Sequence, residues 1–155
     1  MLRIILPVTL LLLAAGCRPA SYEQFIRADQ AQDGEYVFAL DLSDSTATYD
    51  LSLYTRVDPA LMAAATPSAE LALQVCWLVP AEGGTPLEGS TSPACFAVPE
   101  MSEIVYLPFG AEAGSVKLYR SGVKPAPAGE WHLSVTPIAP PEGLRGIGII
   151  CKRVD

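Results

Sequence analysis

The chain is 155 residues long and acidic, with seventeen Asp and Glu residues, ten Lys and Arg residues and a formal net charge of −7. This balance disfavours nucleic acid as a partner, because binding to phosphates needs clustered cations. Half of the residues are hydrophobic, which excludes a chain that is disordered by composition, and the length suits one domain.

The first sixteen residues combine one positive charge with a short apolar run. Arg3 precedes the run Ile4–Leu13, which is well short of the roughly 20 residues that a membrane-spanning helix needs. The small residues that follow end in Leu13-Ala14-Ala15-Gly16-Cys17. This stretch resembles the bacterial lipobox, where the peptide is cut before the cysteine and the thiol is acylated. We therefore expect a lipoprotein signal peptide over residues 1–16 and lipidation at Cys17. The alternative is an ordinary signal peptide, or a short buried helix, with an incidental cysteine.

Acylation at Cys17 would hold the rest of the chain at a membrane. Each buried CH₂ group contributes about 0.8 kcal/mol, and two acyl chains suffice for stable anchoring. Only Arg3 is lost with the signal, so the chain from Cys17 onward has nine basic and seventeen acidic residues and a formal charge of −8. We interpret this acidity as a solubility feature.

Three cysteines follow Cys17, namely Cys76, Cys95 and Cys151. An exported protein can keep disulfides, and a Gly-, Pro- and Ser-rich stretch between Cys76 and Cys95 would allow these two to meet. The sequence favours this pair as the disulfide, closing a loop that contributes roughly 3 kcal/mol, although which of the three cysteines is unpaired stays open. No CxxC spacing occurs and His132 is the one histidine, so we expect no metal site and no cofactor.

The remainder of the chain reads as strands separated by turns. Residues 17–34 are expected to form a lipidated tether and an irregular N-terminal segment. From Glu35 onward, apolar and polar residues alternate with the period of a half-buried strand, and Gly, Pro, Ser and Asp clusters mark the turns. The pattern predicts strands at 35–42, 49–56, 71–79, 95–98, 104–107, 116–120, 131–135 and 144–154, with residues 58–68 as a connector.

These elements predict an all-β protein. Short strands with no amphipathic helix beyond a turn or two are typical of a single antiparallel β-sandwich, here over residues 35–155, and a jelly-roll-like variant is an alternative. The strand that contains Trp77 is apolar on nearly both faces. It is therefore expected in the centre of a sheet.

No enzyme signature stands out from this pattern. His132 would be the general base of a Ser-His-Asp hydrolase, but it lies within a strand between Trp131 and Leu133 and no nucleophile motif is near it. No two carboxylates are marked as a glycosidase pair. We expect a structural or surface histidine and no enzymatic activity.

Two sets of residues are candidates for binding rather than catalysis. Asp41, Asp44 and Asp50 flank one hairpin, yet they lack the D-x-D-x-D-G calcium loop and are expected to cap turns. Aromatic residues on the strands fill cores or cross-strand pairs in most proteins, but exposed ones can stack on sugar rings. The candidates for such stacking are Tyr54, Tyr106 and Tyr119.

Several segments together resemble one protein family. They are the lipobox, the stretch Asp44–Leu51 that runs into a strand, the Trp77 strand, the strand Gly129–Leu133 and the ending Gly143–Ile149. These segments resemble the GldH-like gliding-motility lipoproteins of Bacteroidota. The resemblance implies an outer-membrane lipoprotein that belongs to the gliding machinery or its associated secretion machinery, with no enzymatic activity and no catalytic residues.

The residues after the lipobox cysteine indicate where the anchored protein would lie. Arg18 is not the Asp that favours inner-membrane retention in many bacteria, and Pro19-Ala20-Ser21 is not an acidic surface-export signal. We expect the periplasmic face of the outer membrane. The leading hypothesis is a non-enzymatic interaction protein with envelope partners, and the alternative is a glycan-binding envelope lipoprotein.

Overall fold

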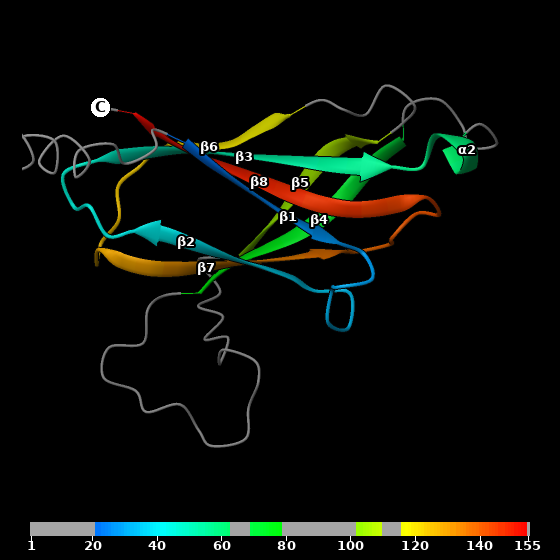
Figure 1. Ribbon diagram of the computed structural model, residues 1–155, viewed down its shortest axis with the longest axis horizontal. Helices are drawn as coiled ribbons and strands as arrows, with labels where there is room; N and C mark the ends of the chain where they lie inside the picture. Colours follow the sequence, from blue (N-terminus) through cyan, green and yellow to red (C-terminus); the bar gives the residue numbers. More distant parts are fainter. Residues whose placement is uncertain (1–20, 63–68, 79–101, 110–115, 155) are drawn as a thin grey trace, which may run out of the picture.

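A computed structural model describes residues 21–62, 69–78, 102–109 and 116–154, which form almost entirely β-structure (Figure 1). One short helix, α2 (Pro59–Met62), follows the third strand. The strands are β1 (Ser21–Arg27), β2 (Tyr36–Leu42), β3 (Thr48–Val57), β4 (Ala69–Leu78), β5 (Ser102–Phe109), β6 (Lys117–Val123), β7 (Gly129–Pro137) and β8 (Leu144–Val154).

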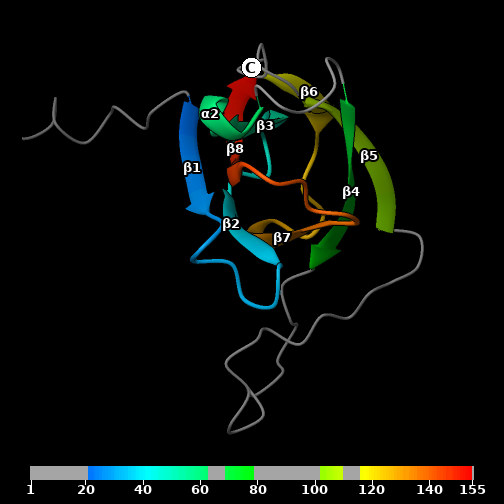
Figure 2. The same ribbon diagram turned by 90° about the vertical axis from the view of Figure 1, so that its right-hand side faces the viewer.

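These strands form two four-stranded antiparallel sheets that pack against each other (Figures 1 and 2). The first sheet has the order β1-β8-β3-β6 and the second β2-β7-β4-β5. The first strand pairs with the last, β2 with β7, β3 with β6 and β4 with β5, as if one long hairpin had been rolled up. This is the strand order of a jelly roll. The predicted all-β sandwich is confirmed, in its jelly-roll variant.

The core lies between the two sheets and is built by the alternation that the sequence predicts. Leu51 and Leu53 on β3, and Leu73 and Val75 on β4, are fully buried, and burial of one such side chain contributes roughly 1.5–3 kcal/mol. Strand β4, which carries Trp77, lies between β7 and β5. The prediction that this strand is central is therefore confirmed.

The N-terminal segment differs from the prediction. Residues 21–27, which fall in the expected irregular segment 17–34, form strand β1 and pair with β8 along their whole length. The alternation is hard to read there because both faces of this edge strand carry an apolar residue: Ile26 packs against the core, whereas Phe25 contacts Tyr54. The sandwich therefore includes residues 21–27, outside the predicted 35–155.

Other boundaries differ in detail. The connector predicted at 58–68 contains α2, and its residues 63–68 lie outside the described residues, as does the strand predicted at 95–98. Strand β5 continues through Pro108 to Phe109. Proline has no backbone N–H to donate. It is tolerated in β5 because this is an edge strand, and on the side that faces no other strand a hydrogen bond is not needed.

The first and last strands bring both ends of the described chain to one end of the sandwich, which we call the terminal end (Figure 1). Ser21 pairs with Lys152, and Val154 pairs with Thr48. The β2–β3 and β6–β7 connections lie at the same end, since Leu42 pairs with Gly129. Within the described residues, no helix is long and apolar enough to cross a membrane.

Candidate interaction surface

The edge strands β5 and β6 belong to different sheets and meet along one side of the sandwich, a line that we call the seam. The Lys117 Nζ donates a hydrogen bond to the Tyr106 carbonyl oxygen. An ion pair joins Arg120 Nη2 to Glu103 Oε1 at 2.7 Å, and the Tyr119 hydroxyl donates to the same carboxylate oxygen at 2.6 Å. These side chains tie the two sheets together where no backbone ladder connects them.

The Tyr119–Glu103 contact holds both groups in their usual charge states at neutral pH. Burial and the hydrogen bond to Glu103 raise the pKa of Tyr119 above its ordinary value. Partial burial acts to raise the pKa of Glu103, but the hydrogen bonds from Tyr119 and Arg120 outweigh it and lower that pKa. A proton donor or acceptor in catalysis needs a pKa near the working pH, so this pair is suited to a structural role.

Four large apolar side chains flank the seam and are about half exposed. They form what we call the seam patch, with exposed fractions of 55% for Ile104, 50% for Tyr106, 51% for Val116 and 55% for Leu118. On β6 it is Tyr119 that points toward the sandwich interior, where it bonds Trp77. The alternation on this strand does not reveal which set faces inward, so the exposure of Val116 and Leu118 was not predicted, whereas Tyr106 was a candidate for an exposed aromatic.

The opposite side of the sandwich is closed differently. There the edge strands β1 and β2 meet, and the Tyr22 hydroxyl accepts a hydrogen bond from the Asp41 N–H at 3.1 Å. The Gln24 side-chain amide donates to the Ala39 carbonyl oxygen. Occupied backbone groups and polar side chains protect a sheet edge from further pairing. Because it carries the apolar seam patch, the β5–β6 side is better suited to binding a partner than the β1–β2 side.

The aromatic residues proposed for sugar stacking do not share one platform. Tyr54 was expected to be exposed, but it is 7% exposed, because its ring lies over Gly148 and stacks on Phe25 with centroids 6.0 Å apart. Burial, together with the hydrogen bond to Glu23, raises the pKa of Tyr54 to about 12. Tyr106 belongs to the seam patch, whereas Tyr119 is turned inward. The exposure expected for Tyr54 was wrong.

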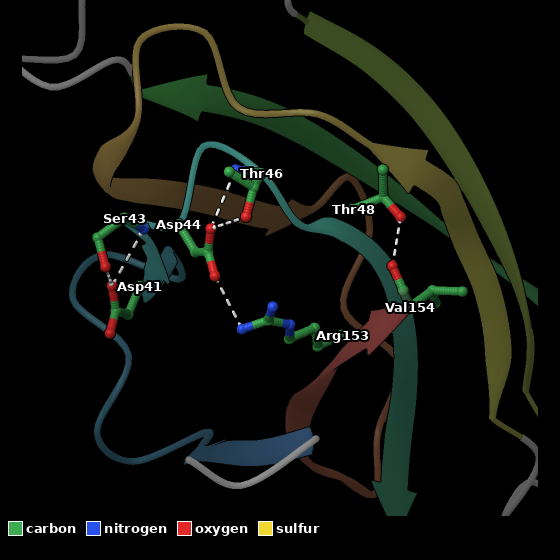
Figure 3. Close-up of polar contacts among 7 residues, drawn as sticks. All are labelled: Asp41, Ser43, Asp44, Thr46, Thr48, Arg153 and Val154. Atoms are coloured by element: carbon green, nitrogen blue, oxygen red, sulfur yellow. Dashed lines mark hydrogen bonds and ion pairs between the residues drawn. The ribbon is translucent and has the colours of Figure 1, made fainter. Parts of the chain in front are cut away.

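Two of the three aspartates considered for calcium, Asp41 and Asp44, act as turn caps (Figure 3). Asp41 Oδ1 accepts hydrogen bonds from the Ser43 N–H and hydroxyl. Asp44 Oδ1 accepts the Thr46 N–H at 3.0 Å, and its Oδ2 pairs with Arg153 Nη1 at 2.8 Å.

The third aspartate caps a different strand. Asp50 Oδ1 accepts hydrogen bonds from the Ser121 hydroxyl and the Gly122 N–H. The predicted turn-capping role is thus confirmed for Asp41 and Asp44, whereas Asp50, within β3, bonds the end of strand β6 instead. Among the residues that the structure describes, no group of three His, Cys, Asp or Glu side chains is placed to hold a metal ion.

His132 lies on β7, and its side chain is 31% exposed. Its Nε2 is 3.5 Å from Glu130 Oε1, and no nucleophile contacts its ring within the described ranges. Of the site cysteines, Cys17 and Cys95 lie outside those ranges, so lipidation and the Cys76–Cys95 disulfide stay predictions. Cys76 is half-buried on β4 and Cys151 is buried on β8, each as a free thiol.

The seam patch holds four of the seven large apolar side chains that are exposed among the described residues. The seam patch contributes apolar area at two strand edges, and the charged groups around it are engaged in ion pairs and turn caps. In comparisons with known proteins, no family model, curated protein or solved structure matches the chain.

Proposed function

We propose that the protein is an outer-membrane lipoprotein, anchored through Cys17 at the periplasmic face, that acts without enzymatic activity in an envelope assembly for gliding motility or its associated secretion. The resemblance to GldH-like lipoproteins suggests the assembly. The observation that carries the interaction role is the seam patch, in which four apolar side chains are each at least 50% exposed.

The seam patch favours a protein partner because of its position. Large exposed apolar side chains at a sheet edge can mark an interaction site, and a sheet edge can accept a partner strand or an apolar surface. Strand β5 pairs with β4 on one side, and within the described residues no strand pairs with its other side. A partner that covers Ile104 and Leu118 would remove their exposed halves from water, which stabilises the complex.

The first experiment tests the surface. The acylated protein is crosslinked in native envelopes, captured by affinity and analysed by mass spectrometry. Leu118→Glu places a charge in the patch and is expected to abolish capture of the partner. Leu61→Glu on α2 is the matched control, because Leu61 is 54% exposed and Leu118 is 55% exposed. Equal capture by the two variants, or no protein companion at all, would contradict the proposal.

The second experiment tests the anchor. Cys17→Ala removes the acylated thiol and is expected to move the protein from the membrane fraction to the soluble fraction while the fold survives, since Cys17 precedes β1. Capture of the partner in cells should be lost with it. Function retained by the soluble form would show that anchoring is not part of the role.

A further inference from the structure

A pocket at the terminal end of the sandwich combines a cavity, two tryptophan side chains and two cationic side chains. Its cavity has a volume of about 290 Å³ and lies between the sheets, where the ends of β2, β4 and β6 and the start of β7 converge. Trp77 and Trp131 form its aromatic wall, with centroids 5.8 Å apart in an edge-to-face arrangement. This volume is just below the range typical of small-molecule sites, so the ligand must be small.

The polar side chains of this pocket are cationic. Arg120 and Lys124 line it together with apolar residues such as Leu42, Val123 and Pro125, and none of its lining residues within the described ranges is acidic. Arg120 is paired with Glu103, so the local excess of positive charge rests on Lys124, a reversal of sign in a chain with seventeen acidic and ten basic residues. Such a reversal raises the local concentration of anions.

These cations retain capacity for a ligand. Arg120 donates to Glu103 through Nε and Nη2, which leaves Nη1 of the guanidinium without a partner among the described residues. Lys124 is exposed and makes no ion pair within the same ranges. A guanidinium and an ammonium together suit a carboxylate or phosphate oxygen.

The hydrogen-bonding groups of the wall favour an anionic ligand over a neutral sugar, because both indole N–H groups are already bonded within the protein. Trp77 Nε1 donates to the Tyr119 hydroxyl at 2.9 Å and Trp131 Nε1 donates to the Pro127 carbonyl oxygen at 2.9 Å. The remaining polar side chains of the wall are Arg120 and Lys124, which are donors only. A neutral sugar needs both donors and acceptors for its hydroxyls, whereas an anionic group needs donors alone.

We infer that this pocket binds a small organic anion with an apolar body. The anionic group binds Arg120 and Lys124 at the mouth, and the apolar part lies against the Trp77 and Trp131 indoles. This site is separate from the seam patch and goes beyond the proposed interaction role. A neutral glycan is the competing occupant that the test distinguishes.

The chain provides its own reporter, because Trp77 and Trp131 are its two tryptophans and both line the pocket. Hexanoate is titrated at low ionic strength into the protein that begins at residue 17 and carries Cys17→Ala, with emission read at selective tryptophan excitation. We expect a saturable change. Hexanamide lacks the charge and acetate lacks the apolar body, so each should bind at least about tenfold more weakly.

Variants separate the site from general charge effects. Lys124→Gln should weaken hexanoate binding about tenfold, the effect of losing one charged hydrogen bond. The matched control Lys152→Gln removes an exposed lysine on β8 and should leave binding unchanged. Four results would overturn the inference: no saturable response at about 50 mM, far above a millimolar Kd; equal binding of hexanamide; tighter binding of methyl glucoside; or unchanged binding in Lys124→Gln.

Discussion

The packing of Tyr54 over Gly148 can be tested with Gly148→Ala, because the sign of the change in the free energy of unfolding shows whether the ring blocks a Cβ atom. The two residues are paired across β3 and β8, and a Cβ atom added at Gly148 would lie 2.1 Å from Tyr54 Cζ. No real Cβ tolerates that distance, so in Gly148→Ala the ring must leave its place. It would then lose its stacking on Phe25, above which the Arg56 guanidinium lies at 4.7 Å.

The expected magnitude follows from three effects. Replacing glycine by alanine inside a strand is by itself stabilising by roughly 0.5–1 kcal/mol. Forcing a side chain out of a packed position costs about 1–3 kcal/mol, and the lost aromatic pair costs about 0.5–1.5 kcal/mol. We expect Gly148→Ala to lower the free energy of unfolding by about 2 kcal/mol.

Urea unfolding followed by tryptophan emission measures this free energy. In a Tyr54→Ala background the ring is absent, and Gly148→Ala should then be neutral or stabilising by up to about 1 kcal/mol. If Gly148→Ala leaves the unfolding midpoint unchanged in the wild-type chain, or has the same effect in both backgrounds, the steric reasoning is wrong.

Three further predictions concern charge and reactivity. The hydrogen bond from Thr46 lowers the pKa of Asp44. Asp44 therefore stabilises the fold above its unfolded pKa of about 3.9, and this stabilisation is lost as the pH falls through the lower pKa of the folded state. In Asp44→Asn, the unfolding midpoint should depend less on pH in the acidic range. Tyr119→Phe removes the donor to Glu103 and should lower the free energy of unfolding by about 1 kcal/mol, while the pKa of Glu103, followed by NMR, moves up. Burial raises the pKa of the Cys151 thiol, so in fully reduced native protein iodoacetamide at alkaline pH should modify the half-buried Cys76 before Cys151, as read by peptide mass spectrometry.

Alternation of apolar and polar residues was enough to predict the sandwich, because strands such as β2 and β4 bury every second residue against one core. It failed for β1, where apolar residues occupy both faces. It also failed for Tyr54, whose burial depends on a glycine 94 positions further along the chain. Such contacts between distant segments leave no periodic signal.

The same limit applies to the candidate sites. The seam patch exists because β5 and β6, the edges of different sheets, meet; nothing near Ile104 or Leu118 in the sequence marks that meeting. The pocket likewise joins Trp77 to Trp131 from two strands, and Lys124 from a connection. Arg120 and Lys124 are only four positions apart in the sequence, but their place beside Trp77 and Trp131 is a product of topology.

The place of β1 has a mechanical consequence for a tethered protein. If the chain is anchored through Cys17, a pull on Ser21 in line with β1 is resisted by the seven residue pairs that join β1 to β8. Force along a strand loads its rungs together in shear, whereas force across it would break them one after another. Because β8 is also paired with β3 on its other side, such a force is distributed over the first sheet and does not separate β1 from β8 one residue pair at a time.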